Sequence, residues 1–274
     1  MNVATVDLYE YHHLPKPQGA VGQLTCYMQP DGLRPAVLVL PGGGYSHVSE
    51  REGKPIALRL VDRGFCAFVL DYAVAPLGFP TALREAAMAM GYIRENAEKL
   101  GICKRHVAAM GFSAGGHLCG SLGTLFDCPE VMDLGPGAVL RPDALGLCYP
   151  VTISYSPTHE GSFACLCGED RALRHRLSLD RLVRPDMPPT YLWHTRNDAS
   201  VPCEGTLILS QKMVQAGLDC VLHLYGSGRH GLATADLETN TPEQLEGLSA
   251  DVPGWIDEFV LFLRERGFAV APNQ

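Results

Sequence analysis

The chain has 274 residues, with 22 Lys and Arg against 30 Asp and Glu, so its formal net charge is −8. This acidic balance argues against a nucleic-acid partner, because a phosphate backbone selects clustered basic side chains. Hydrophobic residues make up 46% and charged residues 19%, which is typical of a folded globular protein rather than a disordered one. No apolar run approaches the ~18 residues that span a bilayer, so we expect no membrane partner.

The ten cysteines are too sparse for a disulfide scaffold in a chain of this length, because such scaffolds exceed about 8–10% Cys. Cys165 and Cys167 are close in sequence, but no second close pair completes a zinc site of the common spacing. We therefore expect reduced thiols and no metal. Residues 1–18 lack the basic and apolar regions of a signal peptide, which predicts a cytoplasmic protein.

Short apolar runs bounded by Gly or Pro alternate with amphipathic stretches along the chain. The runs are near-continuously apolar, which indicates strands buried on both faces of a parallel sheet. Strand–helix alternation of this kind predicts an α/β fold with helices on both faces of a mostly parallel central sheet. The predicted strands are 36–40, 66–70, 107–110, 144–149, 190–194 and 220–225.

Two helices are indicated by apolar residues at three- and four-residue steps, one over 83–93 after Pro80 and one over 255–263 that ends at Gly267. No linker or repeat divides the chain, so we predict a single domain over 1–274. An insertion at about 154–189 interrupts the alternation. It is either a solvated helical segment or a small cap over a substrate pocket.

The sequence Gly-Phe-Ser-Ala-Gly at 111–115 follows a predicted strand and opens a predicted helix. In that setting G-x-S-x-G forms a sharp turn that holds the hydroxyl of the serine above the edge of the sheet. Ser113 is therefore the candidate nucleophile. The backbone N–H of Ala114 is a candidate donor to an oxyanion.

Three consecutive glycines follow the first strong strand, within Pro-Gly-Gly-Gly-Tyr at 41–45. They allow backbone N–H groups to approach a charged oxygen closely, which predicts Gly43 and Gly44 as the other oxyanion donors. A phosphate cradle is disfavoured because no Walker lysine follows. Tyr45 and His47 are candidate substrate contacts, with a solvent-facing position equally open for His47.

A serine nucleophile needs a general base and a carboxylate that orients this base. Asp198 lies in the loop after the strand at 190–194, and His230 lies in the glycine-rich loop after the last strand. Both loops leave the same edge of a parallel sheet, in the order Ser, Asp, His known for hydrolases of this kind. His194 and His223 fall in strands, and His117 is expected to point into its helix. Three other acids, Asp170, Asp186 and Asp219, are less well placed.

These motifs resemble the α/β-hydrolase superfamily, and within it the esterase/lipase branch related to hormone-sensitive lipase. The loop at 41–45 resembles its HGGG loop, and Asp-Tyr-Ala-Val-Ala-Pro at 71–76 resembles its DYRLAP stretch. Pro-Gly-Gly-Gly-Tyr followed by Gly-Phe-Ser-Ala-Gly-Gly-His-Leu is most similar to bacterial acetylxylan-esterase-like carbohydrate esterases. The chain departs from the branch at Pro41, Ala73 and Leu77, where His, Arg and an acidic residue are usual.

The resemblance implies a serine carboxylesterase that acts on short acyl esters, above all O-acetylated sugars or xylo-oligosaccharides, without metal or organic cofactor. The expected partner is a small acylated carbohydrate fragment, and a homo-oligomer is possible. Two alternatives stay open at this point. One is an amide hydrolase on the same scaffold, such as an arylformamidase or a peptidase, and the other is a non-catalytic binding protein.

Overall fold

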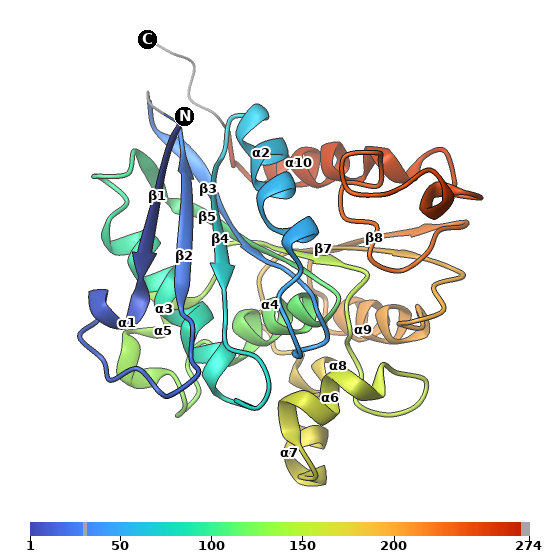
Figure 1. The fold of residues 1–274 in the computed structure, drawn as a ribbon, viewed down its shortest axis with the longest axis horizontal. Coiled ribbons are helices and arrows are strands. Elements are labelled where there is room, and N and C mark those ends of the chain that lie inside the picture. The colour runs from blue at the N-terminus through green and yellow to red at the C-terminus, as the bar shows by residue number, and fades with distance from the viewer. Residues whose placement is uncertain (30–31, 270–274) are drawn as a thin grey trace.

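A computed structural model describes residues 1–29 and 32–269 (Figure 1). Its centre is a sheet with the strand order β1-β2-β4-β3-β5-β6-β7-β8. The strands are β1 (Asn2–Asp7), β2 (Gln23–Met28), β3 (Arg34–Leu40), β4 (Cys66–Asp71), β5 (Ile102–Phe112), β6 (Leu145–Cys148), β7 (Thr190–Thr195) and β8 (Cys220–Tyr225).

The six strands from β3 to β8 are parallel, as the sequence predicts. The predicted α/β fold with a mostly parallel central sheet is thus confirmed. Two further strands, β1 and β2, add an antiparallel edge that the apolar runs do not reveal. The reason is their burial: β1 is largely exposed and β2 is covered only in part, so neither needs a continuous apolar sequence.

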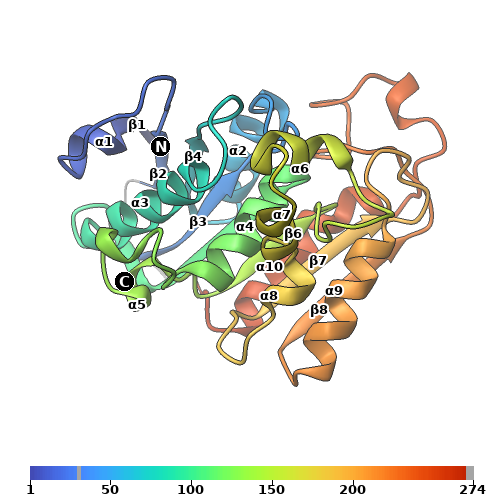
Figure 2. The ribbon, with the colours of Figure 1, turned by 90° about the horizontal axis from the view of Figure 1, so that it is seen from below.

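Helices cover both faces of the sheet, and Figure 2 shows α3, α4 and α9 in a row along one of them. Their apolar side chains share one core cluster, whereas those of α2 and α10 belong to a second cluster on the other face. The main helices are α2 (Lys54–Asp62), α3 (Thr81–Glu95), α4 (Ala114–Leu125), α9 (Glu204–Gln215) and α10 (Trp255–Glu265). The shorter ones are α1 (Leu8–Tyr11), α5 (Gly137–Leu140), and 3-10 helices at Glu50–Glu52, Met132–Leu134, Glu243–Leu245 and Val252–Gly254.

Strand β3 illustrates why the predicted strands are apolar throughout. Leu38 and Leu40 lie in the cluster with α3 and α4, while Val37 and Val39 lie in the cluster with α2 and α10. Successive side chains on a strand point to opposite faces, so a strand between two helical layers has no polar face. Because strands β3 to β8 are parallel, their carboxyl ends lie at one edge of the sheet, where the loops that follow them can carry catalytic residues.

The insertion at 154–189 forms three short helices, which lie together outside the sheet (Figure 1). They are α6 (Glu160–Cys167), α7 (Arg171–Arg176) and α8 (Leu179–Leu182). Two arginines of this segment pair with acidic side chains outside it: Arg176 with Glu130 at 2.6 Å and Arg184 with Asp127 at 2.6 Å. The insertion is therefore anchored to the body of the domain.

Two properties of the described residues complete the fold. None of their helices is long and apolar enough to span a membrane. All ten cysteines lie in the described ranges, and none of them forms a disulfide there.

Candidate active site

Ser113 is the single residue between the end of β5 and the start of α4, and its backbone has φ 54° and ψ −118°. This is a strained backbone conformation for a residue with a side chain. The turn also brings backbones very close together. A Cβ atom on Gly111 would lie 2.0 Å from the carbonyl oxygen of Gly115, and one on Gly115 would lie 2.2 Å from that of Leu40. Only glycine fits at both positions, which explains the spacing of the motif.

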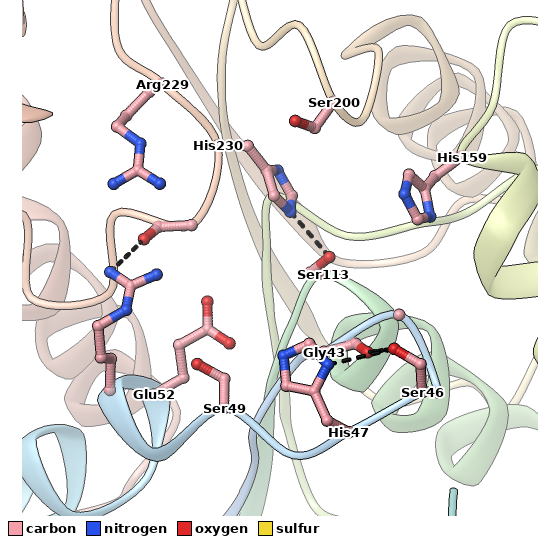
Figure 3. Close-up of a pocket in the computed structure, with 13 residues that line it drawn as sticks. Gly43, Ser46, His47, Ser49, Glu52, Ser113, His159, Ser200, Arg229 and His230 are labelled. Carbon is pink, nitrogen blue, oxygen red and sulfur yellow. Dashed lines mark hydrogen bonds between the residues drawn. The ribbon is translucent and has the colours of Figure 1, made fainter. Parts of the chain in front are cut away.

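The three residues predicted to form a triad contact one another in series, Ser113 to His230 and His230 to Asp198. Figure 3 shows the contact between Ser113 and His230. The Nε2 atom of His230 is 2.8 Å from the Oγ atom of Ser113. On the other side of the ring, Nδ1 of His230 is 2.6 Å from Oδ2 of Asp198. A carboxylate can only accept, so Nδ1 carries the hydrogen and Nε2 is free to accept the hydroxyl proton of the serine.

Asp198 is buried and its carboxylate is fully engaged. Its Oδ1 atom accepts hydrogen bonds of 2.9 Å from the backbone N–H groups of Ser200 and Val201. Its Oδ2 atom lies 3.3 Å from Nε2 of His194, in addition to the contact with His230. Burial raises the pKa of Asp198, but the hydrogen bonds from His194 and His230 outweigh this effect and hold the pKa well below its usual range.

His194, which the sequence places in a strand, is fully buried beside this acid. Its Nε2 atom is also 2.9 Å from the carbonyl oxygen of Val201, and Nδ1 is 2.9 Å from the hydroxyl of Thr206. The strand pattern predicts its burial but gives no sign of its contact with Asp198. His117 is buried too, with ring nitrogens bonded to Tyr45 and to the carbonyl of Leu177.

The glycine loop turns sharply beside Ser113. Gly43 and Gly44 have φ values of 127° and 65°, and a Cβ atom on Gly43 would lie 2.0 Å from the carbonyl oxygen of His47. Among the hydrogen bonds of the described residues, none has the backbone N–H of Gly43, Gly44 or Ala114 as donor. The N–H of Gly42, by contrast, donates to Oε2 of Glu52 at 2.8 Å.

Tyr45 is not where the sequence predicts it. Its side chain is only 3% exposed, and its hydroxyl lies 2.8 Å from Nδ1 of His117, so the phenol packs into the core rather than contacting substrate. Tyr45 has φ 57° and is not among the residues that line the cleft. His47 does line the cleft, and its role as a substrate contact stays a prediction.

A cleft of about 390 Å³ opens above Ser113 and His230. Its lining residues are glycines and residues with polar side chains, namely serine, histidine, arginine and glutamate (Figure 3). Several of these residues carry no signal in the sequence, because they reach the cleft from separate loops. They are Ser46, Ser49, Arg51, Glu52, His159, Ser200, Arg229 and Gly231.

The arrangement suits nucleophilic attack on a carbonyl carbon, because the base His230 lies beside Ser113 and unpaired N–H groups are close by. Within residues 1–29 and 32–269, no group of three or more His, Cys, Asp or Glu side chains could hold a metal ion. The side chains of the cleft can supply proton transfer, covalent attack and hydrogen bonding.

Comparison with known proteins agrees with this geometry. Residues 24–133 match the family described as BD-FAE. The chain is also 35% identical to the solved acetyl ester-xyloside bifunctional hydrolase of Caldicellulosiruptor lactoaceticus, over 97% of both chains and with a TM-score of 0.85. The chain belongs to the α/β-hydrolase esterase family.

Other relatives of this esterase family member point in the same direction. A carboxylesterase of Lactobacillus plantarum is 28% identical over 92% of this chain and 94% of its own, with a TM-score of 0.79. Endo-1,4-beta-xylanase B of Butyrivibrio fibrisolvens is 34% identical over 80% of this chain, and an acetylxylan esterase of Xylanibacter ruminicola is 29% identical over 76%. The chain spans 36% and 43% of the length of these two curated relatives. The resemblance to acetylxylan esterases inferred from the motifs is thus confirmed.

Proposed function

We propose that the protein is a serine carboxylesterase that removes short acyl groups, in the first place acetyl, from small carbohydrate fragments. The observation that carries the proposal is the unbroken line of contacts from Ser113 through His230 to the carboxylate of Asp198. In this arrangement His230 can deprotonate the serine, while Asp198 can hold the base in one tautomer and stabilise the imidazolium that forms.

In the proposed reaction, Oγ of Ser113 attacks the ester carbonyl while Nε2 of His230 takes the serine proton. The N–H groups of Gly43, Gly44 and Ala114 stabilise the oxyanion of the tetrahedral intermediate. His230 then returns the proton to the leaving alcohol, and an acyl-enzyme remains on Ser113. Water, deprotonated by His230, attacks this ester in turn, and the acid leaves as the serine is protonated again.

Two observations favour a sugar as the alcohol. The cleft is lined by hydrogen-bonding side chains rather than by an apolar groove for a long acyl chain. In addition, the names of three relatives refer to xylan or xylosides. Polar groups placed around a cleft of this size favour a polyhydroxylated substrate.

The proposal is tested by incubating the protein with acetylated xylo-, manno- and chito-oligosaccharides and weighing the products. We expect the loss of acetyl groups, and we expect Ser113→Ala to abolish it. Parallel assays with phenyl acetate, formylkynurenine and a proline-amide dipeptide separate ester from amide hydrolysis. Faster cleavage of either amide than of every ester would contradict the proposal and favour an amide hydrolase.

A further inference from the structure

The insertion contributes one side chain to the cleft, His159, whose chemical role follows from its position at the start of α6. We propose that Nε2 of His159 donates a hydrogen bond to a hydroxyl oxygen in the alcohol part of the substrate, and thereby favours sugar esters over simple aryl esters. This inference rests on the proposed esterase function and deepens it, because it assigns a binding role to the segment 154–189.

The tautomer of His159 is fixed by the helix that it caps. Its Nδ1 atom accepts a hydrogen bond of 3.2 Å from the backbone N–H of Ser162 and lies 2.8 Å from the hydroxyl of the same residue. A backbone N–H can only donate, so Nδ1 carries no hydrogen and the neutral ring carries it on Nε2. Ser162 is 1% exposed, which shields this cap from competing water.

The other ring nitrogen of His159, Nε2, is available to bind a ligand. His159 lines the same cleft as Ser113 and His230, and Figure 3 shows its ring on the opposite side of these two residues from Arg229. Its Cε1 atom is 3.7 Å from the position of a Cβ atom on Gly44, so the ring adjoins the predicted oxyanion loop. Among the described residues, no hydrogen bond involves Nε2 of His159.

The surroundings of His159 keep it a donor at neutral pH. Burial lowers its pKa below the usual value, and the neighbouring His230 lowers it further, whereas Asp198 and Glu160 act in the opposite direction. The ring is therefore neutral when the enzyme is assayed near pH 7. Its single hydrogen stays on Nε2 because the cap occupies Nδ1.

The acceptor for this hydrogen is expected outside the acyl group. The carbonyl oxygen of the ester is expected to face the N–H groups of Gly43, Gly44 and Ala114, and the methyl group of an acetyl ester accepts nothing. The hydroxyl groups of a sugar are then the acceptors within reach. A simple aryl ester such as phenyl acetate has none, so it gains nothing from His159.

The test is His159→Asn, because asparagine also caps helices but is too short to carry a donor to the same place. We expect kcat/KM for an acetylated xylo-oligosaccharide to fall about 10-fold, the effect of one lost hydrogen bond, and that for phenyl acetate to change by less than about 2-fold. His175→Asn, an exposed histidine on α7 of the same insertion, is the matched control and should change neither rate.

A second measurement needs no variant. Wild-type enzyme is given an acetylated methyl xyloside and its deoxy analogue that lacks the hydroxyl beside the ester, and we expect a preference of about 10-fold for the former. An equal fall for both esters in His159→Asn, or no preference between the two xylosides, would overturn the inference. The proposed function fails in a different way: wild-type enzyme would release no acetate from any sugar, or Ser113→Ala would stay active.

Discussion

The carboxylate of Glu52 accepts a hydrogen bond of 2.7 Å from the hydroxyl group of Tyr149, 97 residues further along the chain. The other oxygen of Glu52 accepts from the backbone N–H of Gly42, and the hydroxyl of Tyr149 accepts from the backbone N–H of Ala233. The ring of Tyr149 also packs edge-on against His230, with centroids 5.1 Å apart. One buried acid thus joins the glycine loop to the segment that carries the predicted base.

Glu52→Gln should lower kcat for phenyl acetate about 10-fold while changing KM much less. An amide group cannot accept from both donors, and leaving one buried donor unsatisfied costs about 1–3 kcal/mol. Steady-state kinetics of the purified variant, with circular dichroism to verify its fold, measure the effect. Glu50→Gln removes an exposed acid from the same short helix and should behave as wild type. An unchanged kcat in a folded Glu52→Gln protein would show that the contact does not position either loop.

Asp198→Asn should lower kcat by about 10⁴-fold, as the corresponding change does in serine proteases, because the amide favours the wrong tautomer of the histidine. The pKa of this acid is held well below its usual range, so the carboxylate stays ionised as the pH falls through that range. Loss of activity of the wild type around pH 4 should therefore not follow the titration of Asp198. A pH–rate profile from pH 4 to 9 on wild type and variant measures both effects. A variant with more than a tenth of wild-type kcat would argue against the triad.

Gly111→Ala should destabilise the protein by several kcal/mol and abolish activity, because the new Cβ atom would lie 2.0 Å from a backbone oxygen that cannot move aside. Gly254→Ala is the matched control, since a Cβ atom there meets nothing within 4 Å and the backbone has an ordinary φ of −78°. Urea unfolding followed by tryptophan fluorescence compares the two. Similar midpoints for both variants would contradict the close approach at the turn.

Stability should fall as the pH rises through the range in which Glu85 titrates. Burial raises the pKa of this fully buried acid to about 7, above its ordinary value near 4.5. Below pH 4.5 the acid is protonated in both states, and between 4.5 and 7 the unfolded chain loses the proton first. The free energy of unfolding should therefore decrease across this window by about 3 kcal/mol in total.

Urea unfolding at pH 5 and pH 7.5 tests this expectation. Glu85→Gln should show a smaller decrease between the two pH values than wild type, because it has no proton to release. Glu95→Gln, which changes an exposed acid on the same helix, should keep the wild-type decrease. Identical pH dependence in wild type and Glu85→Gln would contradict the raised pKa.

The parts of the molecule that could be predicted are those with local signals. Parallel strands between two helical layers must be apolar throughout, and tight turns that bear a nucleophile or an oxyanion loop need glycine at fixed spacings. Strands β1 and β2 were not predicted, because an exposed antiparallel edge requires neither a continuous apolar sequence nor glycine at fixed spacings.

The supporting groups of the site could not be predicted, because each depends on a contact between distant segments. Glu52 is placed by Gly42 and Tyr149, and His159 shares the cleft with residues from four other segments of the chain. Tyr45 was predicted wrongly for the same reason. Its proximity in sequence to the glycines suggested a substrate contact, but its hydroxyl contacts His117, 72 residues further along the chain, and its side chain is buried.

The crowding around Gly43, Gly111 and Gly115 has a consequence for the engineering of new selectivity. Because a side chain at any of these positions would collide with a backbone carbonyl, libraries aimed at the turns themselves will yield mostly inactive clones. Diversity is better introduced at exposed positions of the segment 154–189, which borders the cleft through His159 without supplying the reacting atoms. A screen for altered acceptor sugars should begin there.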